Sequence, residues 1–261
     1  MNAALDFVAA VGRWAIAGCA LAGRLTLFAL SGLSHLLRPP FYARMFVRAL
    51  IEMGYFSLPV VALTAIFTGM VLALQSSTGL SRFSAESGIA NLVVLSVTRE
   101  LGPVLAGLMV AGRVGAAMAA EIGTMRVTDQ IDALTTLSTN PMKYLVAPRL
   151  LAGIIALPLL VVIADILGVF GGFIIATVSL GFAPRIYLQN TMDFMQTQDV
   201  VSGLVKAAVF GFLIALMGCY HGYNSRGGAE GVGSATTSAV VAASVLILAF
   251  DYVLTELFFA R

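Results

Sequence analysis

Residues 145–178 read LVAPRLLAGIIALPLLVVIADILGVFGGFIIATV, and within them only Arg149 and Asp165 are charged. A transmembrane helix needs about 20 mainly apolar residues, so this stretch is long enough to cross a bilayer with some tilt or protrusion. Pro158 and the glycines at 168, 171 and 172 provide places where such a helix can bend. The stretch predicts an integral membrane protein.

Apolar residues of this kind extend over the whole chain. Of its 261 residues 59% are hydrophobic and 11% are charged, against roughly 25% charged in an ordinary soluble domain. This composition excludes a soluble globule, and a net charge of +2 gives no reason to expect a nucleic-acid surface. We therefore predict an all-α integral membrane protein with five transmembrane helices, at about residues 53–76, 89–117, 145–178, 200–220 and 234–258.

The N-terminal residues 5–37 are apolar but contain Arg13, Arg24 and His35 at intervals that place all three on one helical stripe. We expect an amphipathic helix lying in the membrane interface, because the alternative, a true span, would bury two arginines in hydrocarbon. The sequence Arg38-Pro39-Pro40 ends this helix. Residues 1–40 thus form an interfacial segment and residues 41–261 a transmembrane domain. The start lacks a basic n-region, so we expect no cleaved signal peptide.

Basic residues set the expected orientation. With the N-terminus in the cytoplasm, most arginines and lysines of the connecting segments lie on the cytoplasmic side, and the other side holds only Arg82, Arg185 and Arg261. Five spans then place the C-terminus outside the cytoplasm.

Sequence motifs for nucleotide hydrolysis and for metal chemistry are missing. The chain has two lysines, Lys143 and Lys206, and neither stands in the Gly-x-x-x-x-Gly-Lys-Ser/Thr pattern of a P-loop. His35 and His221 are isolated, and no Gly-x-Ser-x-Gly occurs. We expect no catalytic residue, no metal and no cofactor bound by this chain, so any energy for transport must come from elsewhere.

Ionisable residues occur inside the predicted spans, where an unpaired charge is costly. Arg99 and Glu100 lie in the second span, Lys206 in the fourth and Asp251 in the fifth. Together they would form a nearly neutral cluster that could line a polar cavity. The alternative is a structural network of ion pairs that clamps three helices together.

The segment between the second and third spans has apolar residues at mostly helical spacing and charges of both signs. We predict a short amphipathic cytoplasmic helix at about 121–137. It could be a connector lying on the membrane or a lever that docks into a cytoplasmic partner.

Two further patterns concern packing and binding. Gly107, Ala111, Gly115 and Ala119 recur every four residues and predict a close-packing face, within one subunit or across a dimer. The end of the first span, residues 69–75, carries flexible apolar groups and an amide, and Leu80 and Phe83 follow. This segment could form an apolar pocket with a polar rim that binds an acyl chain and its headgroup. The alternative is that it is an ordinary end of a transmembrane helix.

With these motifs in place the sequence, from about residue 41 to its C-terminus, resembles the MlaE (YrbE) family of ABC-transporter permeases. The most specific stretches are Thr68-Gly-Met-Val-Leu-Ala-Leu-Gln75, Arg99-Glu-Leu-Gly-Pro103, Ala111-Gly-Arg113, Ala120-Glu-Ile-Gly-Thr-Met-Arg126, Gln130, Pro148-Arg149 and Asp251-Tyr-Val-Leu-Thr255.

The resemblance implies a permease homodimer with an ABC ATPase dimer below it, an MCE-protein hexamer above it and, in many systems, a STAS-domain protein. The ATPase uses ATP and magnesium, and the cargo is phospholipid moved between inner and outer membranes. The implied lipid-binding residues are Leu72, Gln75, Leu80, Phe83, Arg99, Glu100, Lys206 and Asp251. The implied ATPase-coupling residues are Glu121, Gly123, Met125, Arg126, Asp129, Gln130, Asp132 and Leu134.

Two other functions remain open. An ion-coupled secondary transporter could use the cluster of Arg99, Glu100, Lys206 and Asp251 as a relay, and it would work without an ATPase. A non-transporting scaffold for an MCE assembly would tolerate neutralisation of the same charges.

Overall fold

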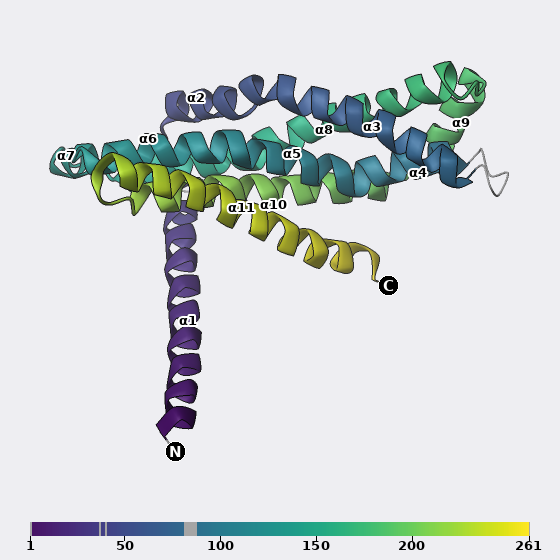
Figure 1. Ribbon diagram of the computed structural model, residues 1–261. Helices are drawn as coiled ribbons and strands as arrows, with labels where there is room; N and C mark the ends of the chain where they lie inside the picture. The colour runs from purple at the N-terminus through teal and green to yellow at the C-terminus, as the bar shows by residue number, and fades with distance from the viewer. Residues whose placement is uncertain (1, 37, 40, 81–87, 261) are drawn as a thin grey trace.

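The computed structural model describes residues 2–36, 38–39, 41–80 and 88–260, which form helices and no strand. Most of the helices run side by side as one elongated bundle (Figure 1). Within the described residues, six segments are long and apolar enough to cross a membrane: Gly12–Leu36, Ala43–Gly79, Gly88–Val127, Met142–Val178, Thr197–Tyr223 and Gly228–Phe259. The last five coincide with the five predicted spans and extend them.

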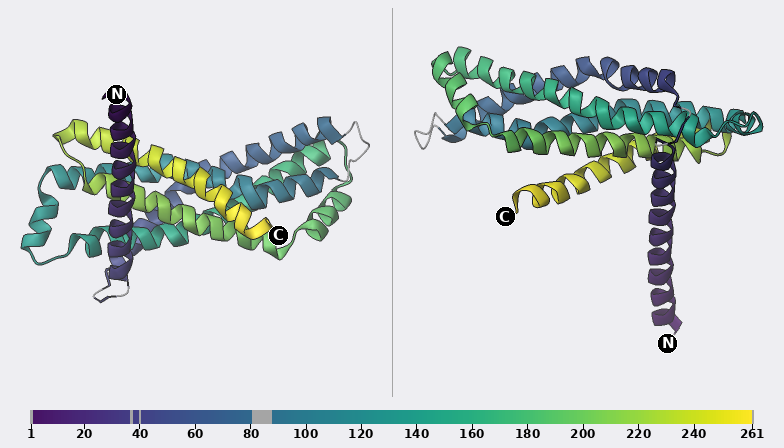
Figure 2. Two further views of the ribbon diagram at one scale, coloured as in Figure 1. Left: turned by 90° about the horizontal axis from the view of Figure 1, so that it is seen from below. Right: turned by 180° about the vertical axis from the view of Figure 1, so that it is seen from behind.

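The N-terminal helix α1 (Asn2–Leu36) is long and apolar enough to span a membrane, but it does not run parallel to the other long helices (Figure 1). It leaves the bundle crosswise in all three views (Figures 1 and 2). Its described side chains are mostly exposed, and Trp14 is 82% exposed. If the bundle crosses the membrane, α1 lies along the membrane surface, which is the arrangement that the spacing of its basic residues predicts.

The first span is built from three helical pieces. Gly54 separates the amphipathic helix α2 from a single 3₁₀ turn, and a long apolar helix follows without a break. The bounds are α2 (Ala43–Met53), η1 (Tyr55–Ser57) and α3 (Leu58–Leu80).

Two π-helical turns interrupt the second span. They lie on either side of a short α-helix, and each ends in a glycine or is followed by one. Such turns are uncommon and are frequent at functional sites. The bounds are α4 (Gly88–Ser96), η3 (Val97–Leu101), α5 (Gly102–Val110), η4 (Ala111–Gly115) and α6 (Ala116–Val127).

The third to fifth spans complete the bundle, and a short helix, α9, joins two of them at one end. Tyr187 fastens α9 to the bundle: its ring packs edge-on against Phe173 at 5.9 Å between centroids, and burial raises the pKa of its phenol to about 12. The bounds are η5 (Met142–Val146, a third π turn), α8 (Ala147–Val178), α9 (Pro184–Phe194), α10 (Thr197–Tyr223) and α11 (Gly228–Phe259).

Glycines hold the central helices in backbone contact. A Cβ added at Gly69 of α3 would lie 1.8 Å from the carbonyl oxygen of Gly168 in α8. On another face of α8, a Cβ at Gly153 would lie 2.4 Å from the carbonyl oxygen of Gly211 in α10. Only glycine permits this approach, so α8 is packed tightly between α3 and α10.

The small-residue face of the second span also packs within this chain. A Cβ at Gly218 of α10 would lie 3.1 Å from the carbonyl oxygen of Gly115, and one at Gly222 would lie 2.9 Å from that of Ala119. Gly107 faces Phe210 of α10 and Ile247 of α11. Of the two alternatives for this face, the one within a single subunit is therefore the one observed.

The prediction of one helix at about 121–137 is wrong in its bounds, because two helices share this segment. Residues 121–127 are the last turns of α6, and a separate helix, α7 (Gln130–Thr136), follows after a sharp break. The break occurs at Asp129, whose φ of 58° is left-handed. Asp and Asn adopt this conformation more readily than most residues, and the apolar periodicity gave no sign of it.

The contact between α3 and α8 yields a stability prediction. Gly69→Ala should lower the free energy of unfolding by roughly 1–3 kcal/mol, because the helices must separate to admit the methyl group. The midpoint of thermal unfolding in detergent should fall by several degrees. Gly79→Ala, in the same helix, is the control, because a Cβ there has no heavy atom within 4 Å. Equal midpoints for the two variants would contradict the proposed backbone contact.

Candidate functional site

The candidate site is built around an irregular turn of the second span, the π turn η3. In the π turn η3 the amide of Gly102 donates to the carbonyl of Val97, five residues back. The next residue, Pro103, has no N–H, so it cannot donate to the carbonyl of Arg99 as a helical residue would. The sequence Gly102-Pro103 thus leaves a backbone acceptor free inside the membrane-spanning bundle, where water is not available to satisfy it.

Lys206 of α10 supplies the missing donor. Its Nζ lies 3.1 Å from the Arg99 carbonyl oxygen, 2.7 Å from Glu100 Oε2 and 2.9 Å from Asp251 Oδ1. It also donates to the Thr255 hydroxyl at 2.7 Å, and Thr255 in turn donates to Glu100 Oε1 at 3.2 Å. The side chain of Lys206 has no exposed surface. This ammonium therefore joins the π turn, α10 and α11.

A glycine lets α10 come close enough for these contacts. A Cβ added at Gly203, one turn before Lys206, would lie 2.4 Å from the carbonyl oxygen of Thr98 in the π turn. Lys206 is nine residues after Thr197, where α10 begins, which places it about 14 Å along that helix. The cluster consequently lies well inside the span rather than at its end.

Arg99 points to a different partner from the one expected. Its guanidinium contacts Asp199 Oδ1, with Nη2 and Nε each at 2.6 Å, and its Cζ lies 4.1 Å from the centroid of the Phe259 ring. The carboxylate of Asp199 also caps α10 by accepting from the backbone N–H of Gln196 at 3.1 Å. The apolar pattern does not single out Asp199, but the spacing Gln196-x-x-Asp199 is that of a capping box at the start of α10.

Three of the four predicted charged side chains, Glu100, Lys206 and Asp251, are thus brought together. The fourth residue, Arg99, joins them through its backbone carbonyl and pairs its side chain with a fifth residue, Asp199. Two cations and three carboxylates give a formal charge of −1 when all are ionised, rather than the near-neutral set expected. The three N–H groups of Lys206 are matched by three hydrogen-bond acceptors, the Arg99 carbonyl, Glu100 and Thr255, and Asp251 adds an ion pair, so the ammonium contacts protein groups and not a bound anion. Arg99 retains 28% exposure of its side chain.

An apolar groove approaches this cluster from α3. It has a volume of about 360 Å³ and is lined by Phe67, Thr68, Val71, Leu72, Gln75 and Leu101. Leu101 lines the groove, and Glu100, the preceding residue of the same π turn, belongs to the charged cluster; none of the residues that line the groove is charged.

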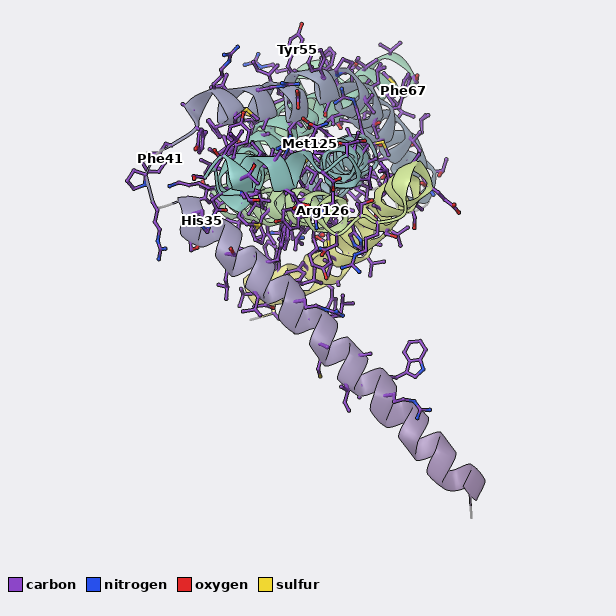
Figure 3. All side chains as sticks on the ribbon, turned by 90° about the vertical axis from the view of Figure 1, so that its left-hand side faces the viewer. His35, Phe41, Tyr55, Phe67, Met125 and Arg126 are labelled. Carbon is purple, nitrogen blue, oxygen red and sulfur yellow. The ribbon has the colours of Figure 1, made fainter. Side chains whose placement is uncertain are left out.

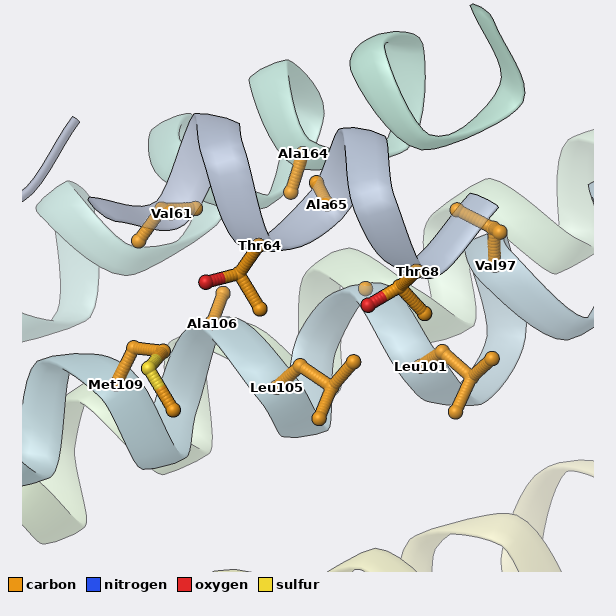
Figure 4. A pocket seen from close by; sticks show the side chains of 11 residues that line it. Val61, Thr64, Ala65, Thr68, Val97, Leu101, Leu105, Ala106, Met109 and Ala164 are labelled. Atoms are coloured by element: carbon orange, nitrogen blue, oxygen red, sulfur yellow. The ribbon is translucent and has the colours of Figure 1, made fainter. Parts of the chain in front are cut away.

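Two of the predicted lipid contacts, Leu72 and Gln75, are in this groove. The side chain of Leu80 and all of Phe83 lie outside the described residues. Farther along the seam between α3 and α5, Thr64, Thr68, Leu101 and Leu105 surround a gap of only about 10 Å³ (Figure 4). The seam is closed, so the groove lies on the outer face of the chain.

A second set of ion pairs lies at the opposite end of the bundle. Arg149 at the start of α8 is 5% exposed, and its Nη2 lies 2.7 Å from Glu121 Oε2 of α6. Arg126 at the end of α6 pairs with Asp132 of α7 at 2.7 Å and lies over the ring of Tyr223 at 5.9 Å. These pairs fasten the corner between α6 and α7 to the bundle.

The predicted coupling residues divide between buried and exposed positions. Gly123 is buried, and Glu121, Met125, Arg126 and Leu134 are partly buried. Asp129, Gln130 and Asp132 are exposed around the break and the start of α7. Figure 3, which looks onto this end of the bundle, shows Met125 and Arg126 close to its centre. At this end of the bundle, the exposed polar residues Asp129, Gln130 and Asp132 therefore lie next to a part of α6 that is held to α8 by the ion pair Glu121–Arg149.

Comparisons with known proteins agree with this architecture. The family model described as Permease MlaE matches residues 46–257. A probable ABC transporter permease protein of Rickettsia felis is 57% identical over 255 residues, covering 98% of both chains. The intermembrane phospholipid transport system permease protein MlaE of Haemophilus influenzae is 34% identical over 258 residues, covering 98% of this chain and 94% of its own.

The enclosed ammonium gives a second prediction. Lys206→Met should lower the free energy of unfolding by about 3–5 kcal/mol, because Glu100 and Asp251 would face each other without a cation. Adding Glu100→Gln and Asp251→Asn to that variant should recover part of the loss. Glu256→Gln, an exposed carboxylate of α11, serves as the control in thermal unfolding in detergent. If the Lys206→Met protein were as stable as the control, Lys206 would not hold η3, α10 and α11 together.

Proposed function

The chain belongs to the MlaE family of ABC-transporter permeases, and from this premise we propose that it moves phospholipids between inner and outer membranes. The energy comes from ATP hydrolysis, with magnesium, in a separate ATPase subunit, and the transport maintains outer-membrane lipid asymmetry. The observation that carries the proposal is the π turn η3, whose Leu101 lines an apolar groove and whose Glu100 belongs to the charged cluster. A phospholipid combines these two characters in one molecule.

The groove also supports a homodimer. It lies on the outer face of α3, where Val60, Leu63, Phe67, Val71 and Leu74 are exposed. A volume of about 360 Å³ is near the lower end for small-ligand sites and holds only part of a two-chain lipid. Two copies facing each other across this surface would enclose a cavity large enough for the whole molecule. In that cavity Leu72 and Gln75 contact the lipid, and Arg99 attracts its phosphate.

The opposite end suits an ATPase dimer. The exposed residues Asp129, Gln130 and Asp132 form the docking edge, while the pair Arg149–Glu121 transmits its movement to α8. In the proposed cycle, closure of the ATPase pushes on α7, the two permeases change their separation, and the lipid passes to or from an MCE-protein hexamer on the far side. A STAS-domain protein completes the assembly. The N-terminus is cytoplasmic and the C-terminus periplasmic in the inner membrane.

The third prediction tests coupling. Asp132→Lys should remove the ion pair with Arg126 and reverse the charge of the docking edge, so ATP-dependent phospholipid transfer between vesicles should fall by at least tenfold. The control is Asp193→Lys in α9, another exposed aspartate at the other end of the bundle. Because this residue lies away from the ATPase docking edge, Asp193→Lys should leave the rate of ATP-dependent phospholipid transfer unchanged.

Two results would overturn the proposal. Normal ATP-dependent transfer by Asp132→Lys would remove α7 from the coupling path. Transfer driven by a proton or sodium gradient, by a permease that copurifies without any ATPase, would instead establish the ion-coupled alternative. A scaffold would show no transfer under either condition.

A further inference from the structure

A second pocket lies far from the proposed lipid groove, at the elbow where α1 meets the bundle. It has a volume of about 200 Å³ and takes its lining from three parts of the chain. These are the end of α1, the start of α2, and the region from η5 to the first turns of α8. The lining residues are His35, Leu36, Phe41, Tyr42, Ala43, Phe46, Lys143, Ala147, Pro148 and Leu151. In Figure 3, His35 and Phe41 lie on the same side of the bundle, where α1 departs.

Hydrogen bonds give this pocket a fixed polar rim. The Oδ1 of Asn140 accepts from the backbone N–H of Met142 at 3.0 Å, which turns its Nδ2 toward His35 Nε2 at 3.2 Å. His35 Nε2 is then an acceptor, and Nδ1 carries the hydrogen that is donated to the Ser31 carbonyl at 2.6 Å. The rim is therefore organised before any ligand arrives.

Lys143 is the cation of this rim. Its Nζ donates to the Pro39 carbonyl oxygen, which uses one of its three N–H groups. Among the described residues, no carboxylate lines the pocket. The exposed arginines Arg38 and Arg44 lie beside it in sequence. Positive charge above an apolar floor is complementary to a phosphate that carries an acyl chain.

The location favours a membrane lipid over a soluble anion. Because α1 runs crosswise to the spans, its junction with them lies at the membrane surface (Figure 1). Phe41 lines the pocket and is 69% exposed, as expected of an aromatic side chain at the interface. A volume of about 200 Å³ is below the usual range for a whole small ligand, so it suits a headgroup and the first part of one chain.

We propose that this elbow pocket binds an anionic phospholipid of the leaflet nearest α7, as a resident lipid that fixes α1 to the bundle and not as transported cargo. Its phosphate contacts Lys143, and its acyl chain lies over Ala147, Pro148 and Leu151. The site is separate from the groove on α3, and binding to it requires no ATPase, so its test is independent of the proposed transport.

The experiment uses the full-length chain in nanodiscs of phosphatidylcholine with a trace of photoactivatable phosphatidylglycerol. After irradiation, mass spectrometry measures the lipid cross-linked to residues 41–46. Excess unlabelled phosphatidylglycerol should compete with this labelling, and excess phosphatidylcholine or inorganic phosphate should not. Lys143→Gln should lower labelling about tenfold, the loss expected for one charge-assisted hydrogen bond.

Two further variants separate binding from folding. Arg48→Gln is the matched control, because Arg48 is an exposed arginine of α2 that pairs with Glu52 at 2.9 Å and does not line the pocket. It should label like the wild type. Ala43→Trp, which fills the pocket without changing charge, should also reduce labelling. Wild-type labelling of Lys143→Gln or Ala43→Trp would overturn the proposal, as would equal competition by phosphatidylcholine or by inorganic phosphate.

Discussion

The structure depends on one buried ammonium. Lys206 has no exposed surface, and removing a cation from water costs several kcal/mol unless hydrogen bonds and opposite charge offset the loss. Here Glu100 and Asp251 supply the charge, and Thr255 and the Arg99 carbonyl supply further acceptors. These groups come from three segments that are distant in sequence, so their positions cannot change independently. The arrangement of η3, α10 and α11 around this point follows from the need to satisfy a single side chain.

This constraint explains why the second span is irregular. A proline in a helix normally leaves a carbonyl without its partner, and in a membrane that carbonyl is costly. At Pro103 the cost is offset by Lys206, and the close approach of Gly203 makes the contact possible. The same π turn carries Leu101 toward the groove on α3. The polar and apolar halves of the candidate site are therefore consequences of one local distortion.

The sequence was sufficient to predict features that depend on composition and periodicity. Uninterrupted apolar stretches located the five spans, and the positions of Arg13, Arg24 and His35 predicted the crosswise α1. Four of the five members of the charged cluster could also be predicted, because they are ionisable residues inside apolar spans. Two features could not. The pairing of Arg99 with Asp199 depends on how α10 begins, and the break at Asp129 depends on a single left-handed residue. Neither changes the apolar pattern.

The distribution of glycine contacts indicates which parts of the bundle can move. Helices α3, α8 and α10 touch through their backbones at Gly69, Gly153 and Gly211, and such close-packed helices shift together rather than slide past one another. Helix α11 runs obliquely to them (Figure 2) and has few buried residues. Near its C-terminal end it is held by polar contacts to Lys206 and by the ring of Phe259 against Arg99. In the proposed coupling cycle, a force applied at α7 passes through α6 and its ion pair Glu121–Arg149 into the rigid group of helices. The contacts that can yield to it are therefore the outer surface of α3 and the polar attachments of α11, which border the proposed lipid site.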